Sequence, residues 1–166
     1  MTLAEAAVEA AALAEKGDER HLAELRAAWD EELEAAARSA DFRERAVAYR
    51  AISQFRFRQK IELLRRGLED ESPACRGSAL ISLESLSRDH PSVVNGMRPL
   101  LHELVSRDGN SAVRRLAVMS LRNGSAQRDT IGILTALADD DEADRELRAA
   151  AAKVAQLLRR KAGPSK

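Results

Sequence analysis

Cysteine and aromatic residues are scarce in this chain of 166 residues. A single cysteine, Cys75, cannot form an internal disulfide, and five aromatic residues without β-branched runs argue against a sheet. No apolar run approaches the ~20 residues that span a bilayer, and the first residues lack the basic segment of a signal peptide. These absences predict a helical protein of the cytoplasm that does not associate with membranes.

Neither sign of charge is in excess. Lys plus Arg and Asp plus Glu both number 27, and this balance argues against a globally basic nucleic-acid-binding protein. The charges are nevertheless zoned along the chain. Residues 1–41 hold eleven acids and four bases, whereas residues 42–68 hold eight bases and two acids. The zoning predicts an acidic surface next to a basic one.

Strong helix formers are abundant, and alanine alone fills 31 of the 166 positions. Capping residues, glycines and prolines divide the chain into segments with helical spacing of apolar residues. The sequence predicts nine helices, near residues 2–16, 18–39, 41–55, 57–68, 73–89, 93–104, 113–121, 131–137 and 147–158. A capping box of Thr2 and Glu5 should begin the first helix, and the sixth should carry Val93, Met97, Leu100 and Leu104 on one face.

An arginine followed three residues later by alanine recurs at the start of four of these helices, with spacings of 31, 38 and 34 residues. The repeated arginines are Arg45, Arg76, Arg114 and Arg148. We interpret them as structural, each pairing with an acidic turn residue such as Asp70 or Asp108 of its own or the neighbouring repeat. The small alanine lets adjacent helices approach closely, so Ala79 and Ala117 should lie in tight interhelical contacts.

The order of an acidic turn, an apolar residue before the arginine, a small residue and a second helix rich in leucine resembles the HEAT-repeat pattern over residues 41–161. The resemblance implies an all-α, right-handed α-solenoid of antiparallel helix pairs. Residues 1–162 would form a single domain, with residues 1–40 as an atypical N-terminal capping pair and residues 163–166 as a disordered tail. The tetratricopeptide repeat, which lacks its Trp-x-x-Leu-Gly-x-x-Tyr signature here, and an irregular helical bundle are the alternatives.

Catalytic and metal-binding motifs are missing. The histidines His21, His90 and His102 are far apart, and a serine stands where a zinc-protease motif needs a histidine four residues after His102. Deoxyhypusine hydroxylases, which are similar in their HEAT-like repeats, hold iron with several His-Glu pairs, and this chain has one. Cys75 corresponds to apolar residues in other repeats and is interpreted as a small core residue. We therefore expect no enzyme, cofactor or metal; a HEAT-like lyase or hydroxylase is the enzymatic alternative.

A basic strip follows the helix predicted over residues 57–68, in which Phe57, Ile61, Leu64 and Leu68 should face the core. In HEAT-like folds the second helix of each pair lines the concave face. The expected partner-binding residues are Arg56, Arg58, Lys60, Arg65 and Arg66, together with the matching positions Arg98, His102 and Arg128 on later second helices.

This strip predicts a protein-binding adaptor or scaffold that takes an acidic segment of its partner on the concave face. A nucleic-acid-binding HEAT-like protein is the alternative function. A solvated helix face with ordinary Arg58–Glu62 and Glu62–Arg66 pairs explains the same pattern without any function.

The last predicted helix has no second helix to complete its pair. Leu147, Val154 and Leu158 can cover the two preceding helices, but Leu157 should stay exposed. The exposed leucine predicts a surface for a partner or for self-association, in a protein that is a monomer or a weak homo-oligomer.

Overall fold

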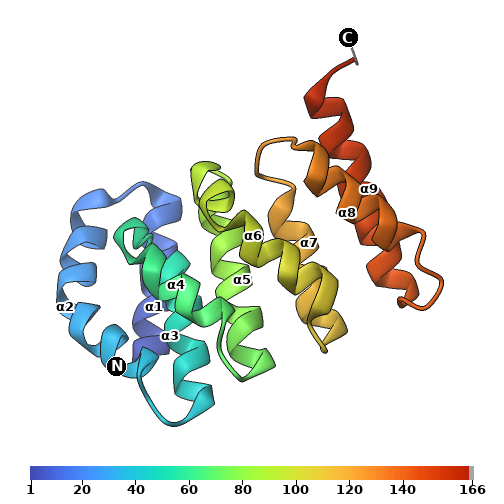
Figure 1. Cartoon of the computed structure of the whole chain (residues 1–166). Helices are drawn as coiled ribbons and strands as arrows, with labels where there is room; N and C mark the ends of the chain where they lie inside the picture. Colours follow the sequence, from blue (N-terminus) through green and yellow to red (C-terminus); the bar gives the residue numbers. More distant parts are fainter. Residues whose placement is uncertain (165–166) are drawn as a thin grey trace. The chain divides into compact units, whose positions relative to one another are not determined.

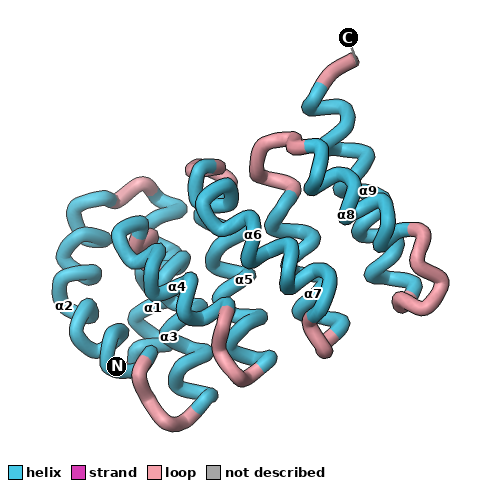
Figure 2. The backbone as a smooth tube through the Cα atoms, viewed as in Figure 1, coloured by secondary structure: helices cyan, strands magenta, loops and turns pink. Residues whose placement is uncertain are grey.

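The computed structural model describes residues 1–164; the end of the predicted tail, residues 165–166, lies outside the described residues. Over that range the chain forms nine α-helices and one 3₁₀ turn, and contains no strand (Figures 1 and 2). The predicted all-α class and the number of helices are confirmed. The chain divides into two compact units, one over Met1–Leu86 and one from Ser87 onward.

The first unit contains α1 (Leu3–Lys16), α2 (Glu19–Ala37), α3 (Phe42–Gln54), the 3₁₀ turn η1 (Arg58–Lys60), α4 (Ile61–Leu68) and all but the last residue of α5 (Pro73–Ser87). The second unit contains α6 (Ser92–Arg107), α7 (Ser111–Leu121), α8 (Arg128–Ala138) and α9 (Arg145–Ala162). None of the helices within residues 1–164 has the length and apolar character needed to cross a membrane.

Short polar side chains begin the helices. Thr2 and Glu5 form the predicted capping box of α1, in which each side chain accepts a hydrogen bond from the other residue's backbone N–H. Asp144 caps α9 by accepting from the N–H of Leu147 at 3.0 Å. Gly17 ends α1 in the left-handed region, with a φ of 73°, which is the conformation glycine adopts without strain. Capping residues and the glycine after α1 therefore mark the helix ends in the structure, as they do in the sequence.

Neighbouring helices of the first unit pack with their backbones close together. Helices α1, α2 and α3 pack on one another, and α4 follows α3. Ser82 of α5 donates a hydrogen bond of 2.5 Å to the carbonyl of Tyr49 on α3. A Cβ atom at Gly67 of α4 would lie 2.8 Å from the Cβ of Ala79 on α5. Glycine is therefore required at this crossing, and Ala79 lies in a tight interhelical contact as predicted.

In the second unit each helix packs on the next one or the next but one. Helix α6 contacts α7 and α8, and α9 contacts both α7 and α8. Ala117 of α7 is fully buried, and Leu147, Val154 and Leu158 of α9 are buried as the sequence predicted. Leu157 stays 39% exposed, which is also as predicted.

Two helices differ from their predicted register. Helix α4 begins at Ile61 because a 3₁₀ turn occupies residues 58–60, and its buried face includes Leu63 in place of the half-buried Ile61. In α6 the buried stripe runs through Val94 and Leu101, whereas Val93 and Leu100 are only half-buried. Both shifts decide which basic side chains reach the surface.

Candidate interaction surface

The repeated arginine of α3 makes the ion pair expected for it. The Nε and Nη2 atoms of Arg45 donate to the two carboxylate oxygens of Asp70 at 2.9 and 3.0 Å, and Nη1 donates to the carbonyls of Ser39 and Ala40. Burial raises the pKa of Asp70, but the Arg45 hydrogen bonds and a backbone hydrogen bond from Ser72 outweigh it, so the net pKa is lowered. The predicted contact of Arg45 with an acidic turn residue, Asp70, is present in the structure.

The other repeated arginines bind backbone or turn acids in different ways. Arg76 donates to the carbonyls of Asp70 and Glu71, which precede it by the same intervals as Ser39 and Ala40 precede Arg45. Arg114 donates to the carbonyl of Val105 at 2.8 Å, and Arg148 lies 3.8 Å from the carboxylate of Asp141. The pattern of a guanidinium on the preceding turn is therefore shared by Arg45 and Arg76.

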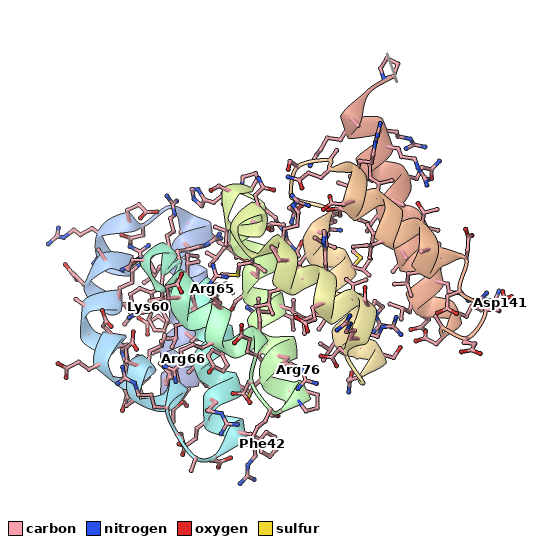
Figure 3. The ribbon with its side chains drawn as sticks, in the orientation of Figure 1. Phe42, Lys60, Arg65, Arg66, Arg76 and Asp141 are labelled. Atoms are coloured by element: carbon pink, nitrogen blue, oxygen red, sulfur yellow. The ribbon has the colours of Figure 1, made fainter. Side chains whose placement is uncertain are left out.

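Lys60 is not available to a partner, contrary to the prediction. Its ammonium group donates to Asp30 and Glu34 of α2, both at 2.7 Å, and the residue is 9% exposed (Figure 3). Burial lowers the pKa of Lys60, but the two carboxylates outweigh it and raise the pKa above its ordinary value. The physical reason is the 3₁₀ turn, whose three-residue period places Lys60 beneath Phe57, with the ammonium 5.0 Å from the ring centroid.

Arg98 is also buried, where the sequence predicted an exposed position. It is 5% exposed and donates to Thr130 at 2.7 Å and to Asn95 at 2.5 Å, and it also bonds Ser125. The shifted stripe of α6 explains this, since residue 98 stands four residues after buried Val94 and three before buried Leu101. Burial without a carboxylate in contact lowers the pKa of Arg98.

His102 lies beside this network and is half-buried. Its Nε2 atom is 2.8 Å from the hydroxyl oxygen of Thr130, and burial lowers its pKa. Arg128, the remaining basic position predicted in this unit, is exposed at the first turn of α8. Of the three positions predicted on later second helices, Arg98 is buried in hydrogen bonds to the chain itself, His102 is half-buried, and Arg128 is exposed to solvent.

The strip of α4 is smaller than the sequence predicted. Arg56 is half-buried in the turn after α3 with a φ of 58°, and the Nε atom of Arg65 lies 3.3 Å from the Glu62 carboxylate. Glu62 therefore pairs with Arg65 rather than with Arg58 or Arg66. Among residues 1–164, no hydrogen bond or ion pair engages the side chain of Arg58 or Arg66, and both are exposed.

Arg66 stands between two hollows of the first unit. One, of about 520 Å³, is lined by Arg38, Arg45, Tyr49 and Glu71 among others. The second, of about 270 Å³, also has Arg66 in its wall. Arg66 is labelled on α4 in Figure 3. Sequence reasoning found the arginine but missed the hollows, because they arise from the packing of α2, α3 and α4.

Cys75 is fully buried, and its thiol lies 3.2 Å from the carbonyl oxygen of Phe42. Burial raises the pKa of this thiol, which opposes the thiolate that a nucleophile needs. The interpretation of Cys75 as a small core residue agrees with this environment. Within residues 1–164, no three His, Cys, Asp or Glu side chains gather into a group suited to a metal ion.

Comparison with known proteins finds no family model that matches the chain and no curated protein that matches its sequence.

Proposed function

We propose that this chain is a HEAT-like helical adaptor of the cytoplasm, without catalytic activity, that binds an acidic segment of a partner protein. The binding surface is the exposed side of η1 and α4, centred on Arg58 and Arg66. The proposal is based on which basic side chains of this surface already have a carboxylate partner within the chain. Lys60 and Arg65 are engaged by carboxylates of the chain itself, whereas Arg58 and Arg66 are exposed and without a partner among the described residues.

An arginine that has no partner within the chain is well suited to bind a carboxylate of another molecule. The guanidinium group presents a planar set of donors that match a carboxylate in two-point geometry. The hollows of about 520 and 270 Å³ on either side of Arg66 offer room for the partner's neighbouring side chains. Charges at such a surface mainly accelerate association and set specificity, so added salt should slow association.

Few free charges favour a short acidic peptide over a nucleic acid. A nucleic-acid-binding surface draws its affinity from many neutralised phosphates, and affinity falls steeply with salt in proportion to their number. Here η1 and α4 supply two free guanidinium groups, and the α2 carboxylates of Asp30 and Glu34 lie nearby. Because these carboxylates repel any anion, the surface accommodates a short acidic segment better than a long chain of phosphates.

A fluorescence anisotropy titration tests the proposal. The probes are a short labelled Asp- and Glu-rich peptide and a labelled oligothymidylate of similar net charge, each titrated at low and at high salt. The variant is Arg58→Glu with Arg66→Glu. The control is Arg107→Glu with Arg145→Glu, which makes the same change in net charge at two exposed positions of the second unit.

We expect the α4 variant to bind the acidic peptide at least about tenfold more weakly than wild type, and the control to stay within about twofold. Equal weakening in both double variants would show a response to net charge alone. Tighter binding of the oligothymidylate than of the peptide would instead support the nucleic-acid alternative. Unchanged binding by the α4 variant would refute the proposed surface.

A further inference from the structure

A third hollow of the first unit is distinct from the α4 surface. It measures about 800 Å³ and is formed by the start of α1, the second half of α2 and the start of α3. Leu3, Ala4, Ala36 and Val47 contribute apolar lining, and Val47 is 37% exposed. We name it the α1–α3 hollow. Its size suits several side chains of a docked helix rather than one small group.

The unpaired charged side chains that line the α1–α3 hollow are acidic. Its basic residue, Arg43, is held by Asp41, with Nε and Nη2 at 3.1 and 3.3 Å from the carboxylate oxygens. Glu32 and Glu44 also line the hollow, are exposed, and make no ion pair within residues 1–164. The hollow therefore combines an apolar lining with two unpaired carboxylates, and it fits an apolar side chain flanked by bases.

The outer face of α9 has that chemistry. Helix α9 contains six bases and one acid. Lys153, Leu157 and Arg160 are spaced by four and three residues, so they lie on one side of the helix, and all three are exposed. Leu157 is 39% exposed although Leu158 beside it is fully buried. We name Lys153, Leu157 and Arg160 the α9 face.

The bases of the α9 face are free, whereas other bases of the same helix are not. Arg159 donates to the hydroxyl of Thr135 at 2.5 Å, and Lys161 donates to the carbonyls of Arg122 and Gly124. No hydrogen bond or ion pair holds the side chains of Lys153 and Arg160 within the described residues. Leu157 is the large apolar side chain exposed on α9, and it lies between two free bases on the same side of the helix.

We propose that the α9 face of one copy of this chain docks into the α1–α3 hollow of a second copy. Leu157 covers the apolar lining, and Lys153 and Arg160 pair with Glu32 and Glu44. The argument for a second copy is that one chain carries both complementary surfaces. Because the two surfaces differ, the contact is head-to-tail, and each copy retains one unused surface until a ring closes or a filament grows.

Sedimentation velocity at increasing protein concentration, with an exchange of charges, tests this proposal. The first variant is Glu32→Lys with Glu44→Lys, and the second is Lys153→Glu with Arg160→Glu. A control, Glu15→Lys with Glu103→Lys, makes the same charge change as the first variant at exposed positions outside both surfaces. Circular dichroism verifies that each variant keeps its helix content.

Wild type and control should rise above the monomer mass of 18.2 kDa as concentration increases. Each variant alone should stay monomeric, because like charges then meet at the contact, weakening association by more than about tenfold. A mixture of the two variants should associate again, since every contact between them joins opposite charges. A wild type that stays at 18.2 kDa at the highest concentration, or a mixture that stays monomeric, would overturn the proposal.

Discussion

Replacing Arg45 by methionine removes the guanidinium that joins the start of α3 to the turn after α4, while keeping a long side chain. The Arg45 and Asp70 side chains are 12% and 8% exposed, so the pair is close to buried. Removing one partner of a buried ion pair costs ~3–5 kcal/mol, because the other charge is left without compensation. Asp70 keeps the hydrogen bond from the N–H of Ser72 at 2.9 Å, which places the expected loss for Arg45→Met near the lower limit, about 3 kcal/mol.

A double-mutant cycle with Asp70→Asn isolates the pair. Asparagine keeps an acceptor for Ser72 but removes the charge, so Asp70→Asn alone should cost about 2 kcal/mol. The double variant should cost less than the sum of the single changes, with a coupling energy of about 2 kcal/mol from urea unfolding monitored by circular dichroism. A coupling energy below about 0.5 kcal/mol would refute the view that this ion pair stabilises the first unit.

The same pair predicts a pH dependence. The pKa of Asp70 is lower in the folded protein than its ordinary value of 3.8, so its contribution is complete above that value. The contribution is lost as the pH falls through the lowered folded pKa. The difference in unfolding free energy between wild type and Asp70→Asn should therefore shrink on acidification, and a constant difference would contradict this assignment.

Gly67→Ala should lower stability by ~1–3 kcal/mol, because the new Cβ meets the Cβ of Ala79 at 2.8 Å. The control Gly132→Ala, whose new Cβ has nothing within 4 Å, should stabilise its helix. Equal melting temperatures of the two variants would refute the close crossing of α4 and α5. Burial lowers the pKa of His102 from its ordinary 6.5, so stability should fall as the pH drops below that value, and the urea midpoint of His102→Gln should lose this dependence. Lys60→Gln should cost about 1–2 kcal/mol yet leave binding of the acidic peptide unchanged, and weakened binding would return Lys60 to the interaction surface.

Much of the fold could be predicted from the sequence because its signals are local. The capping box of Thr2 and Glu5 and the glycine at position 17 act within a few residues, and the structure shows both. The pairing of Arg45 with Asp70 was also predictable, since an arginine at the start of a helix lies close to the preceding and following turns. Buried Cys75 followed from the apolar residues at equivalent repeat positions.

The surroundings of the basic strip were predicted less well, because the identity of a residue does not show whether its charge is free. Lys60 and Arg66 are both bases of the same strip. The 3₁₀ turn directs Lys60 to the α2 carboxylates of Asp30 and Glu34, while Arg66 stays exposed between two hollows. That distinction depends on contacts between residues 26 and 30 positions apart, which no local pattern specifies.

Helix α6 is a second case in which the local sequence did not specify which side chains are buried. Apolar doublets at residues 93–94, 100–101 and 104–105 allow two adjacent stripes, and the stripe predicted from the sequence was the one with Val93 and Leu100. In the folded protein the stripe with Val94 and Leu101 is the buried one, and Arg98 on the same side donates a hydrogen bond to Thr130 of α8. The sequence by itself thus determined the helices, their caps and the arginine that binds a turn. Tertiary packing decided which bases are buried, because a rotation of one residue along a helix turns each side chain by about 100°.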